Sequence, residues 1–172
     1  MSIRLTVRKA ATQDLPSLWD MTRDLGKTQD VDYFDKCLRL QSQGKREVLI
    51  VSVEDKDAGY GILNWVPKYA PFKKLGIPEI QDLNVIPAFR RRGIATDVIQ
   101  YCEDLARDKG YQDMGIAFGL HSSYGAAQRL YIKLGYVPDG QGVTYDRKQI
   151  AYGDFKPVDD DLCLMLIKAL EK

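Results

Sequence analysis

The sequence has few of the residues that build metal centres and disulfide frameworks. It contains one histidine, His121, and three widely separated cysteines, Cys37, Cys102 and Cys163. A zinc site usually needs three or four Cys or His ligands, often in close pairs, so no metal is predicted. An odd number of unclustered cysteines argues against disulfides and fits a reducing compartment. We therefore expect a cytoplasmic protein.

Long apolar runs and an excess of one charge are also missing. The longest apolar stretches, 48–51 and 162–167, fall far short of the roughly 18 residues that a membrane span needs. The N-terminal residues alternate apolar with polar side chains and lack the apolar core of a signal peptide. With 25 basic and 24 acidic residues the net charge is +1, so no overall field attracts nucleic acid or anionic lipid. We expect neither a membrane nor a nucleic-acid partner.

What is present is typical of one globular domain. The 172 residues are 45% hydrophobic and 28% charged, and a chain of this length buries most of its apolar surface without disulfides. No internal repeat, low-complexity tract or linker interrupts the sequence. We predict a single domain over residues 1–172.

Hydrophobic periodicity predicts the order of the secondary-structure elements. Alternating or compact apolar runs predict strands at 3–7, 48–53, 60–65, 80–86, 114–119 and 162–167. Apolar residues at helical spacing, with capping or stop residues, predict helices at 13–25, 32–42, 94–109 and 122–134. The second half therefore contains a parallel pair of strands joined by a crossover helix, while 48–65 forms an antiparallel hairpin.

Two segments are predicted to be loops. Residues 67–78 hold three prolines and fit either a plain connector or a lid that contacts substrate. Residues 138–157 are rich in Gly and Asp and are expected to contain at most one short strand.

The most informative pattern lies in residues 79–96, where a strand and a short basic loop lead into a helix that begins at a glycine. The first turn of a helix offers unpaired N–H groups and a partial positive charge, which suit an anion. Gly93 and Ala95 allow phosphate oxygens to approach the backbone, and Arg90, Arg91 and Arg92 add positive charge. This pattern predicts a ligand with a diphosphate, although a solvated turn would use the same residues. It matches neither a P-loop nor a Gly-x-Gly-x-x-Gly fingerprint.

Two motifs in this half of the chain resemble the GCN5-related N-acetyltransferase (GNAT) superfamily. Leu83-Asn84-Val85 followed by Arg90-Arg91-Arg92-Gly93-Ile94-Ala95 resembles the family's Gln/Arg-x-x-Gly-x-Gly/Ala signature. Leu130-Tyr131, followed by Gly135-Tyr136, resembles its Leu-Tyr-x-x-x-Gly-Phe/Tyr motif. The motifs cover about residues 79–137, and the order of elements extends the resemblance over nearly the whole chain.

The resemblance implies an α/β (α+β) fold with a mixed, mostly antiparallel central sheet and helices on both faces. In such a sheet a parallel fourth and fifth strand splay apart to admit pantetheine. The donor would be acetyl-CoA, bound by Leu83, Val85, Arg90, Arg91, Arg92, Gly93, Ile94, Ala95, Thr96, Ser123 and Tyr124. The resemblance implies acetyl transfer to a primary amine that attacks the thioester directly, with N–H groups near Leu83–Val85 polarising the carbonyl.

Two positions depart from the family pattern. The last motif glycine is Ala95, whose N–H remains available. The asparagine often found seven residues before the motif tyrosine is Tyr124, so its pantetheine contact must come from Tyr124, Ser123 or neither. The small residues Gly115, Ala117 and Gly119 either leave room for the pantetheine arm or allow close helix packing.

The resemblance also implies catalytic residues. Tyr131 matches the tyrosine that protonates the departing thiolate, and a half-buried structural tyrosine is the alternative. A protonated amine must lose a proton before it attacks, and Glu79 matches the base of histone-acetylating members. Asp82 is the rival base, on the opposite face of a regular strand unless a bulge intervenes. A water chain or His121 is a further alternative.

The acceptor is not encoded in these motifs. A small polyamine, an aminoglycoside, an amino acid and a protein amine all remain open. Acidic residues of the first two predicted helices and of 159–161 fit either a wall that attracts a cationic amine or solvated surfaces; those of the helices are Asp20, Asp24, Asp30, Asp32 and Asp35. A non-catalytic acyl-CoA-binding or regulatory module of the same fold is the alternative function. Dimers are common in families of this fold, so a homodimer is also open.

Overall fold

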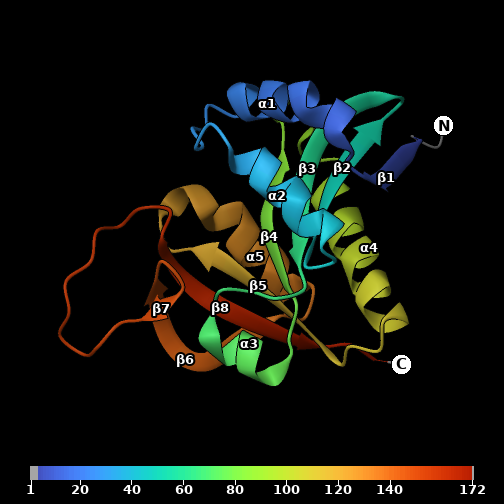
Figure 1. Cartoon of the computed structure of the whole chain (residues 1–172). Coiled ribbons are helices and arrows are strands. Elements are labelled where there is room, and N and C mark those ends of the chain that lie inside the picture. The colour runs from blue at the N-terminus through green and yellow to red at the C-terminus, as the bar shows by residue number, and fades with distance from the viewer. Residues whose placement is uncertain (1–3, 172) are drawn as a thin grey trace. The chain divides into compact units, whose positions relative to one another are not determined.

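The computed structural model describes residues 4–171, and Figure 1 labels its helices and strands in chain order. The strands are β1 (Leu5–Lys9), β2 (Arg46–Val53), β3 (Lys56–Asn64), β4 (Glu79–Val85), β5 (Asp113–Gly119), β6 (Val137–Tyr145), β7 (Lys148–Gln149) and β8 (Leu162–Ala169). The α-helices are α1 (Leu15–Asp24), α2 (Tyr33–Ser42), α3 (Ala70–Leu75), α4 (Ile94–Asp108) and α5 (Gly125–Lys133). Short 3-10 turns precede α1 and α5 and follow β4.

The chain divides into two compact units. The first contains the residues up to Trp65 together with Ile80–Asp104, and the second contains Val66–Glu79 and the residues from Leu105 onward. Strand β4 is shared, because its first residue, Glu79, belongs to the second unit. The prediction of a single domain over 1–172 stays a prediction.

The sheet has the predicted class. The hydrogen-bonded strand order is β1-β2-β3-β4-β5-β8-β6-β7, mostly antiparallel with β4 and β5 parallel. In the first unit β2 and β3 form the predicted antiparallel hairpin, with Val48 opposite Ile62. In the second unit β8 lies antiparallel between β5 and β6, and the Gly115 N–H donates to the Pro78 carbonyl just before β4, at 2.8 Å.

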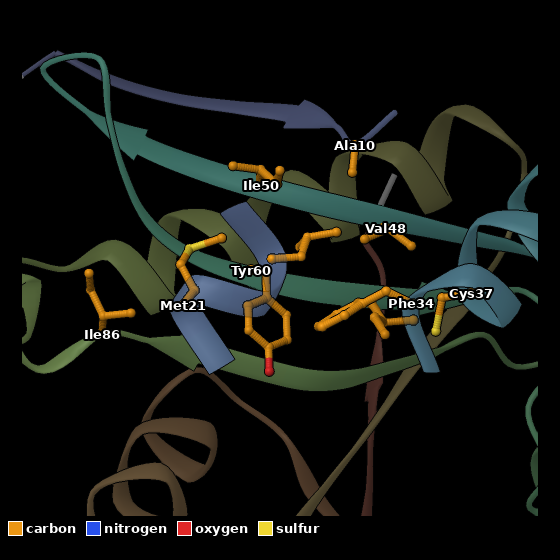
Figure 2. Packing of buried hydrophobic residues seen from close by; sticks show 10 residues of the cluster. Ala10, Met21, Phe34, Cys37, Val48, Ile50, Tyr60 and Ile86 are labelled. Carbon is orange, nitrogen blue, oxygen red and sulfur yellow. The ribbon is translucent and has the colours of Figure 1, made fainter. Parts of the chain in front are cut away.

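Helices cover both faces of the sheet in the first unit. On one face α1 and α2 pack over β2 and β3, and Figure 2 shows Phe34 beside Tyr60 in this layer. Phe34 makes edge-to-face contacts with Trp19 and Tyr60 at centroid distances of 4.8 and 5.4 Å. On the other face α4 packs closely, because a Cβ on Gly61 would lie 3.6 Å from the Val98 side chain. Side chains alternate along β2 and β3, so one set packs against α1 and α2 and the other packs on the face that α4 covers.

The second unit also has helices on both faces of its strands. Phe72 of α3 packs with Tyr69, Ile77 and Met165. Phe118, whose side chain alternates with those that face α3, stacks on Tyr131 of α5 at 6.5 Å. The predicted fold class, with helices on both faces, is confirmed.

The two predicted loops contain more regular structure than expected. Within 67–78, α3 begins with Pro71 in its first turn and ends at Gly76, whose φ is +68°. The residues 138–157 contain most of β6, a nine-residue strand whose pairing with β8 shifts register between Pro138 and Val143. Both elements were missed because proline and glycine lower the local propensity for helices and strands. Burial of Phe72 in α3 and pairing of β6 with β8 outweigh this low propensity.

Candidate functional site

The basic loop after β4 exposes backbone donors at the start of α4. Gly93 has a φ of +76°, and the first bond of the helix runs from the Asp97 N–H to the Gly93 carbonyl at 3.1 Å. The N–H groups of Ile94, Ala95 and Thr96 are therefore left without an acceptor inside the helix. A Cβ on Gly93 would meet no atom within 4 Å, so the backbone is open to an approaching ligand.

The three arginines of this loop are exposed and differ in their contacts. Arg90 donates from Nε to the Val85 carbonyl at 3.0 Å, which ties the loop to the end of β4. Arg91 has a φ of +63°, and the Arg92 guanidinium lies over the Phe89 ring at 5.3 Å. Three cations beside unpaired N–H groups suit a diphosphate, so the residues present fit the phosphates of CoA.

Strand β4 is irregular at Asp82, where φ is +45°. The Asn84 side chain donates to the Asp82 carbonyl at 2.8 Å, and the Tyr33 hydroxyl of α2 donates to the Asp82 carboxylate. The regular alternation that would place Glu79 and Asp82 on opposite faces therefore does not apply. Leu83 and Val85 remain in β4 and are partly exposed.

Glu79 lies in a different environment, in the second unit. Its side chain is 0% exposed, and its Oε1 accepts hydrogen bonds from Nε and Nη2 of Arg147 at 2.9 and 2.7 Å. Arg147 stands in the turn between β6 and β7, where its φ is +61°. Two hydrogen bonds from one guanidinium fix the orientation of this buried carboxylate and limit its movement.

Tyr131 lies on α5 and is 7% exposed. Burial raises the pKa of its phenol to about 12, because the charged phenolate is poorly solvated there. No hydrogen bond from its hydroxyl is present among residues 4–171. The hydroxyl therefore stays protonated over the physiological range and has no protein acceptor competing for its proton.

The turn before α5 holds Ser123 and Tyr124 through local contacts. His121 is the N-cap of the 3-10 turn Ser122–Tyr124, and its Nδ1 accepts from the Ser123 N–H at 3.2 Å. Tyr124 occupies the N-cap position of α5. Tyr124 donates to Asp160 at 2.6 Å. A Cβ on Gly119 would lie 2.5 Å from the Tyr124 ring, so this ring fills the space that the glycine leaves.

The predicted site residues fall into two groups. The first unit brings Asp82, Leu83 and Val85 into one strand that leads directly into the loop of Arg90–Thr96. The second unit contains Glu79, Ser123, Tyr124 and Tyr131. Their roles toward a donor or an acceptor stay predictions.

Two residues with clear roles in these groups were missed from the sequence. Arg147 lies 68 positions after Glu79, and Tyr33 lies 49 positions before Asp82. Neither belongs to a motif, and only strand pairing and helix packing bring such distant residues together. Asp146 and Arg147 form a turn in which both residues have a positive φ. The sequence of this turn does not indicate that Arg147 takes part in a buried ion pair.

The acidic side chains of the first two helices are partly neutralised. Asp20 pairs with Arg23 at 2.8 Å, and Asp32 pairs with Lys36 at 2.9 Å. The hydrogen bond from Lys36 holds the pKa of the Asp32 carboxyl below its usual value. These exposed pairs are typical of solvated helix faces.

The described part of the chain shows neither a group of metal ligands nor a membrane-spanning helix. In residues 4–171 no group of three or more His, Cys, Asp or Glu side chains is placed to hold a metal ion. None of the helices in this range has the length and apolar character needed to cross a membrane.

Comparison with known proteins identifies the family. Residues 15–136 match the model of the acetyltransferase (GNAT) family, which covers more than half of the chain. The chain therefore belongs to the acetyltransferase (GNAT) family, and the resemblance drawn from the motifs is confirmed. No curated protein matches the chain in sequence.

Solved structures share the fold at low sequence identity. An acetyl transferase of Salmonella typhimurium that modifies the N-terminal serine of the ribosomal protein L7/L12 has a TM-score of 0.72 and 14% identity, covering 99% of this chain and 97% of its own. The ribosomal-protein-alanine N-acetyltransferase of Brucella melitensis has a TM-score of 0.71 and 17% identity, covering 96% and 99%. The yncA protein of Salmonella typhimurium, solved with its cofactor acetyl-CoA, has a TM-score of 0.67 and 17% identity, covering 98% and 95%.

The buried ion pair leads to a prediction on stability. Arg147→Met should lower the free energy of unfolding by about 3–5 kcal/mol, because it removes the guanidinium that pairs with the buried Glu79 carboxylate. Adding Glu79→Gln to this variant should restore part of the loss, since a neutral amide is less costly to bury than a carboxylate. Urea denaturation followed by circular dichroism measures both effects.

Lys68→Met is the matched control for this experiment. It breaks the exposed pair between Lys68 and Asp146, which lies at the same turn at 2.8 Å, and should cost at most about 1 kcal/mol. Equal losses in Arg147→Met and Lys68→Met would show that the Glu79–Arg147 pair has no special structural role.

Proposed function

We propose that this protein is an N-acetyltransferase that moves an acetyl group from acetyl-CoA to a primary amine. The observation that carries the proposal is the open start of α4, where Gly93 has a positive φ and three backbone N–H groups lack helical acceptors beside Arg90–Arg92. This segment lies inside the family match. The ribosomal acetyltransferases named above modify protein amines, and yncA binds acetyl-CoA, which supports the same donor and reaction type here.

In the proposed donor complex, the N–H groups of Ile94, Ala95 and Thr96 and the side chains of Arg90–Arg92 bind the diphosphate. Leu83 and Val85 of β4 supply backbone groups that orient the thioester carbonyl, whose oxygen gains negative charge during attack. Ser123 and Tyr124 are the proposed contacts to the remainder of the donor. No metal has a role in this proposal.

The chemical step needs one proton acceptor and one proton donor. The amine nitrogen forms a bond to the acetyl carbon, and the carbon–sulfur bond breaks to release the thiolate. The proton lost by the amine passes to a carboxylate or to water. Tyr131 gives its hydroxyl proton to the thiolate, and its protonated form persists because of its high pKa.

Of the two candidate carboxylates, Asp82 suits the amine better. Glu79 is fully buried and its Oε1 is engaged twice by Arg147, whereas Asp82 is partly exposed and accepts a hydrogen bond from the neutral Tyr33 phenol. Because the Arg147 guanidinium occupies the buried Glu79 carboxylate, a ligand amine can reach Asp82 more readily than Glu79. We propose Asp82 as the carboxylate that meets the acceptor and Glu79 as a structural anchor.

The competing function is a module that binds acyl-CoA without turnover. Release of free thiol from acetyl-CoA in the presence of a panel of amines distinguishes the two. Acceptor-dependent thiol release, with an N-acetylated product detected by mass spectrometry, is expected. Tight acetyl-CoA binding with no turnover of any amine would favour the binding module.

Donor binding should depend on Gly93. Gly93→Val should weaken acetyl-CoA binding at least about tenfold, which is ~1.4 kcal/mol, because a branched side chain disfavours the positive φ and crowds the phosphates. Isothermal titration calorimetry measures the dissociation constant. The control is Gly110→Val, at the other end of α4, where φ is +85° and a Cβ also meets nothing within 4 Å. Loss of affinity in both variants, or in neither, would contradict phosphate binding at Gly93.

Turnover should depend on the Tyr131 hydroxyl. Tyr131→Phe keeps the stacking on Phe118 and should lower kcat by roughly 10²–10⁴-fold with little change in acetyl-CoA binding. Because the pKa of Tyr131 is about 12, the wild-type rate should not fall between pH 8 and 10 through loss of this proton. A decrease in kcat of less than threefold, with chemistry rate-limiting, would make Tyr131 structural.

The choice of carboxylate can be tested with two isosteric variants. Asp82→Asn should abolish most turnover near neutral pH while acetyl-CoA still binds, and Glu79→Gln should retain turnover in proportion to its folded fraction. The wild-type rate should rise between about pH 6.5 and 9 as the enzyme base or the amine loses its proton. The opposite result would transfer the base to Glu79, and full activity in both variants would indicate a water chain. The pH profile is then repeated with amines of different pKa. A rise that moves with the pKa of the amine belongs to the acceptor, and a rise that stays at the same pH belongs to the enzyme.

A further inference from the structure

An arginine without a carboxylate partner lies on the face of the first unit's sheet that α2 covers. Arg46 begins β2, and its Nη1 donates to the Cys37 thiol of α2 at 3.2 Å. Its Nε is buried and has no acceptor, and no ion pair to Arg46 is present among residues 4–171. A thiol is a weak acceptor, and partly buried cations are normally paired with an anion. Arg46 therefore has unused capacity to bind a negatively charged oxygen.

One nitrogen of this guanidinium remains open to a ligand. Nε is the only Arg46 nitrogen that is both buried and unpartnered, so Nη2, which makes no hydrogen bond within the described chain, keeps contact with solvent. Asn64 is the register partner of Arg46, and its amide lies 3.5 Å from the Gln81 side-chain oxygen. A carboxylate at Nη2 would thus meet a charged donor with polar amides beside it.

A carboxylate is held by the same helix. Tyr33 and Cys37 are four residues apart on α2, and Tyr33 donates to the Asp82 carboxylate while Cys37 contacts Arg46. These two positions are about 6 Å apart along the helix axis, which is one turn. Asp82 and Arg46 are therefore both held by residues on one face of α2.

We propose that the acetyl acceptor is a small zwitterion of the amino-acid type, whose ammonium lies at Asp82 and whose carboxylate lies at Arg46. This inference rests on the proposed acetyl transfer and names its acceptor. A polyamine is disfavoured, because its second ammonium would face the Arg46 guanidinium. After loss of its proton at Asp82, the same nitrogen is the nucleophile.

The wild-type enzyme tests this directly. Glycine, β-alanine and 4-aminobutyrate are each compared with the amine that lacks the carboxylate: methylamine, ethylamine and propylamine. Free-thiol release from acetyl-CoA gives kcat/KM, expressed per free amine so that differences in amine pKa cancel. At least one zwitterion should exceed its carboxylate-free partner tenfold or more. Equal or faster turnover of the carboxylate-free amines in every pair, or a preference for spermidine, would overturn the assignment.

Two variants assign the preference to Arg46. Arg46→Gln should raise KM for the preferred zwitterion at least tenfold and leave KM for its carboxylate-free partner unchanged, whereas Arg39→Gln, on the exposed face of α2, should change neither. Retained acetyl-CoA binding in calorimetry shows that each variant is folded. If Arg46→Gln does not fold, Arg46→Lys replaces it and should raise KM for the zwitterion by a smaller factor, because it keeps the charge and loses the planar set of N–H donors. A uniform loss with both acceptors would make Arg46 structural and overturn its role.

Failure of the proposed acetyl transfer gives a different experimental result from failure of the acceptor assignment. If acetyl-CoA binds and none of these small amines releases thiol, the acceptor assignment is wrong. Acetyl transfer itself is wrong only if peptides with a free N-terminus and lysine side chains also release no thiol. Turnover of carboxylate-free amines alone overturns only the acceptor assignment.

Discussion

The irregular backbone of β4 is the feature on which the rest of the candidate site depends. At Asp82 the chain has a positive φ, and the Asn84 amide holds the Asp82 carbonyl at 2.8 Å. Strand β3 approaches this segment closely only because residue 59 is glycine, since a Cβ there would lie 2.2 Å from the Asn84 carbonyl oxygen. A regular β4 would lose the contact between Asp82 and Tyr33, because the alternation of its side chains would change.

The two acidic residues of β4 illustrate how environment separates similar groups. Glu79 is buried against a guanidinium, which stabilises a fixed negative charge at the cost of dehydrating both partners. Asp82 is partly exposed and accepts a hydrogen bond from Tyr33 of α2, the helix whose Cys37 contacts Arg46. Such a pair suits a division of labour, in which one carboxylate fixes a turn and the other meets a cationic ligand.

The glycines of β5 make room for aromatic rings that pack against this strand. A Cβ at Gly115 would lie 2.2 Å from the Phe72 ring, and one at Gly119 would lie 2.5 Å from Tyr124. The glycines therefore accommodate rings of α3 and of the turn before α5, which is the close-packing alternative of the sequence analysis. Because α3 was expected to be a loop, the source of the ring at Gly115 was not predictable.

The sequence by itself determined the family and the class of sheet, and it predicted an anion-binding role for the loop before α4. Periodicity, a glycine at the start of a helix and the motif around Tyr131 are local properties, so they are readable without tertiary contacts. Only the tertiary structure decided the partners of the charged groups. Arg147 reaches Glu79, and Tyr33 and Arg46 reach Asp82 and Cys37, through strand pairing and helix packing. Their sequence separation leaves no periodic signal, because such contacts depend on how distant elements meet and not on the residues that lie beside them in the chain.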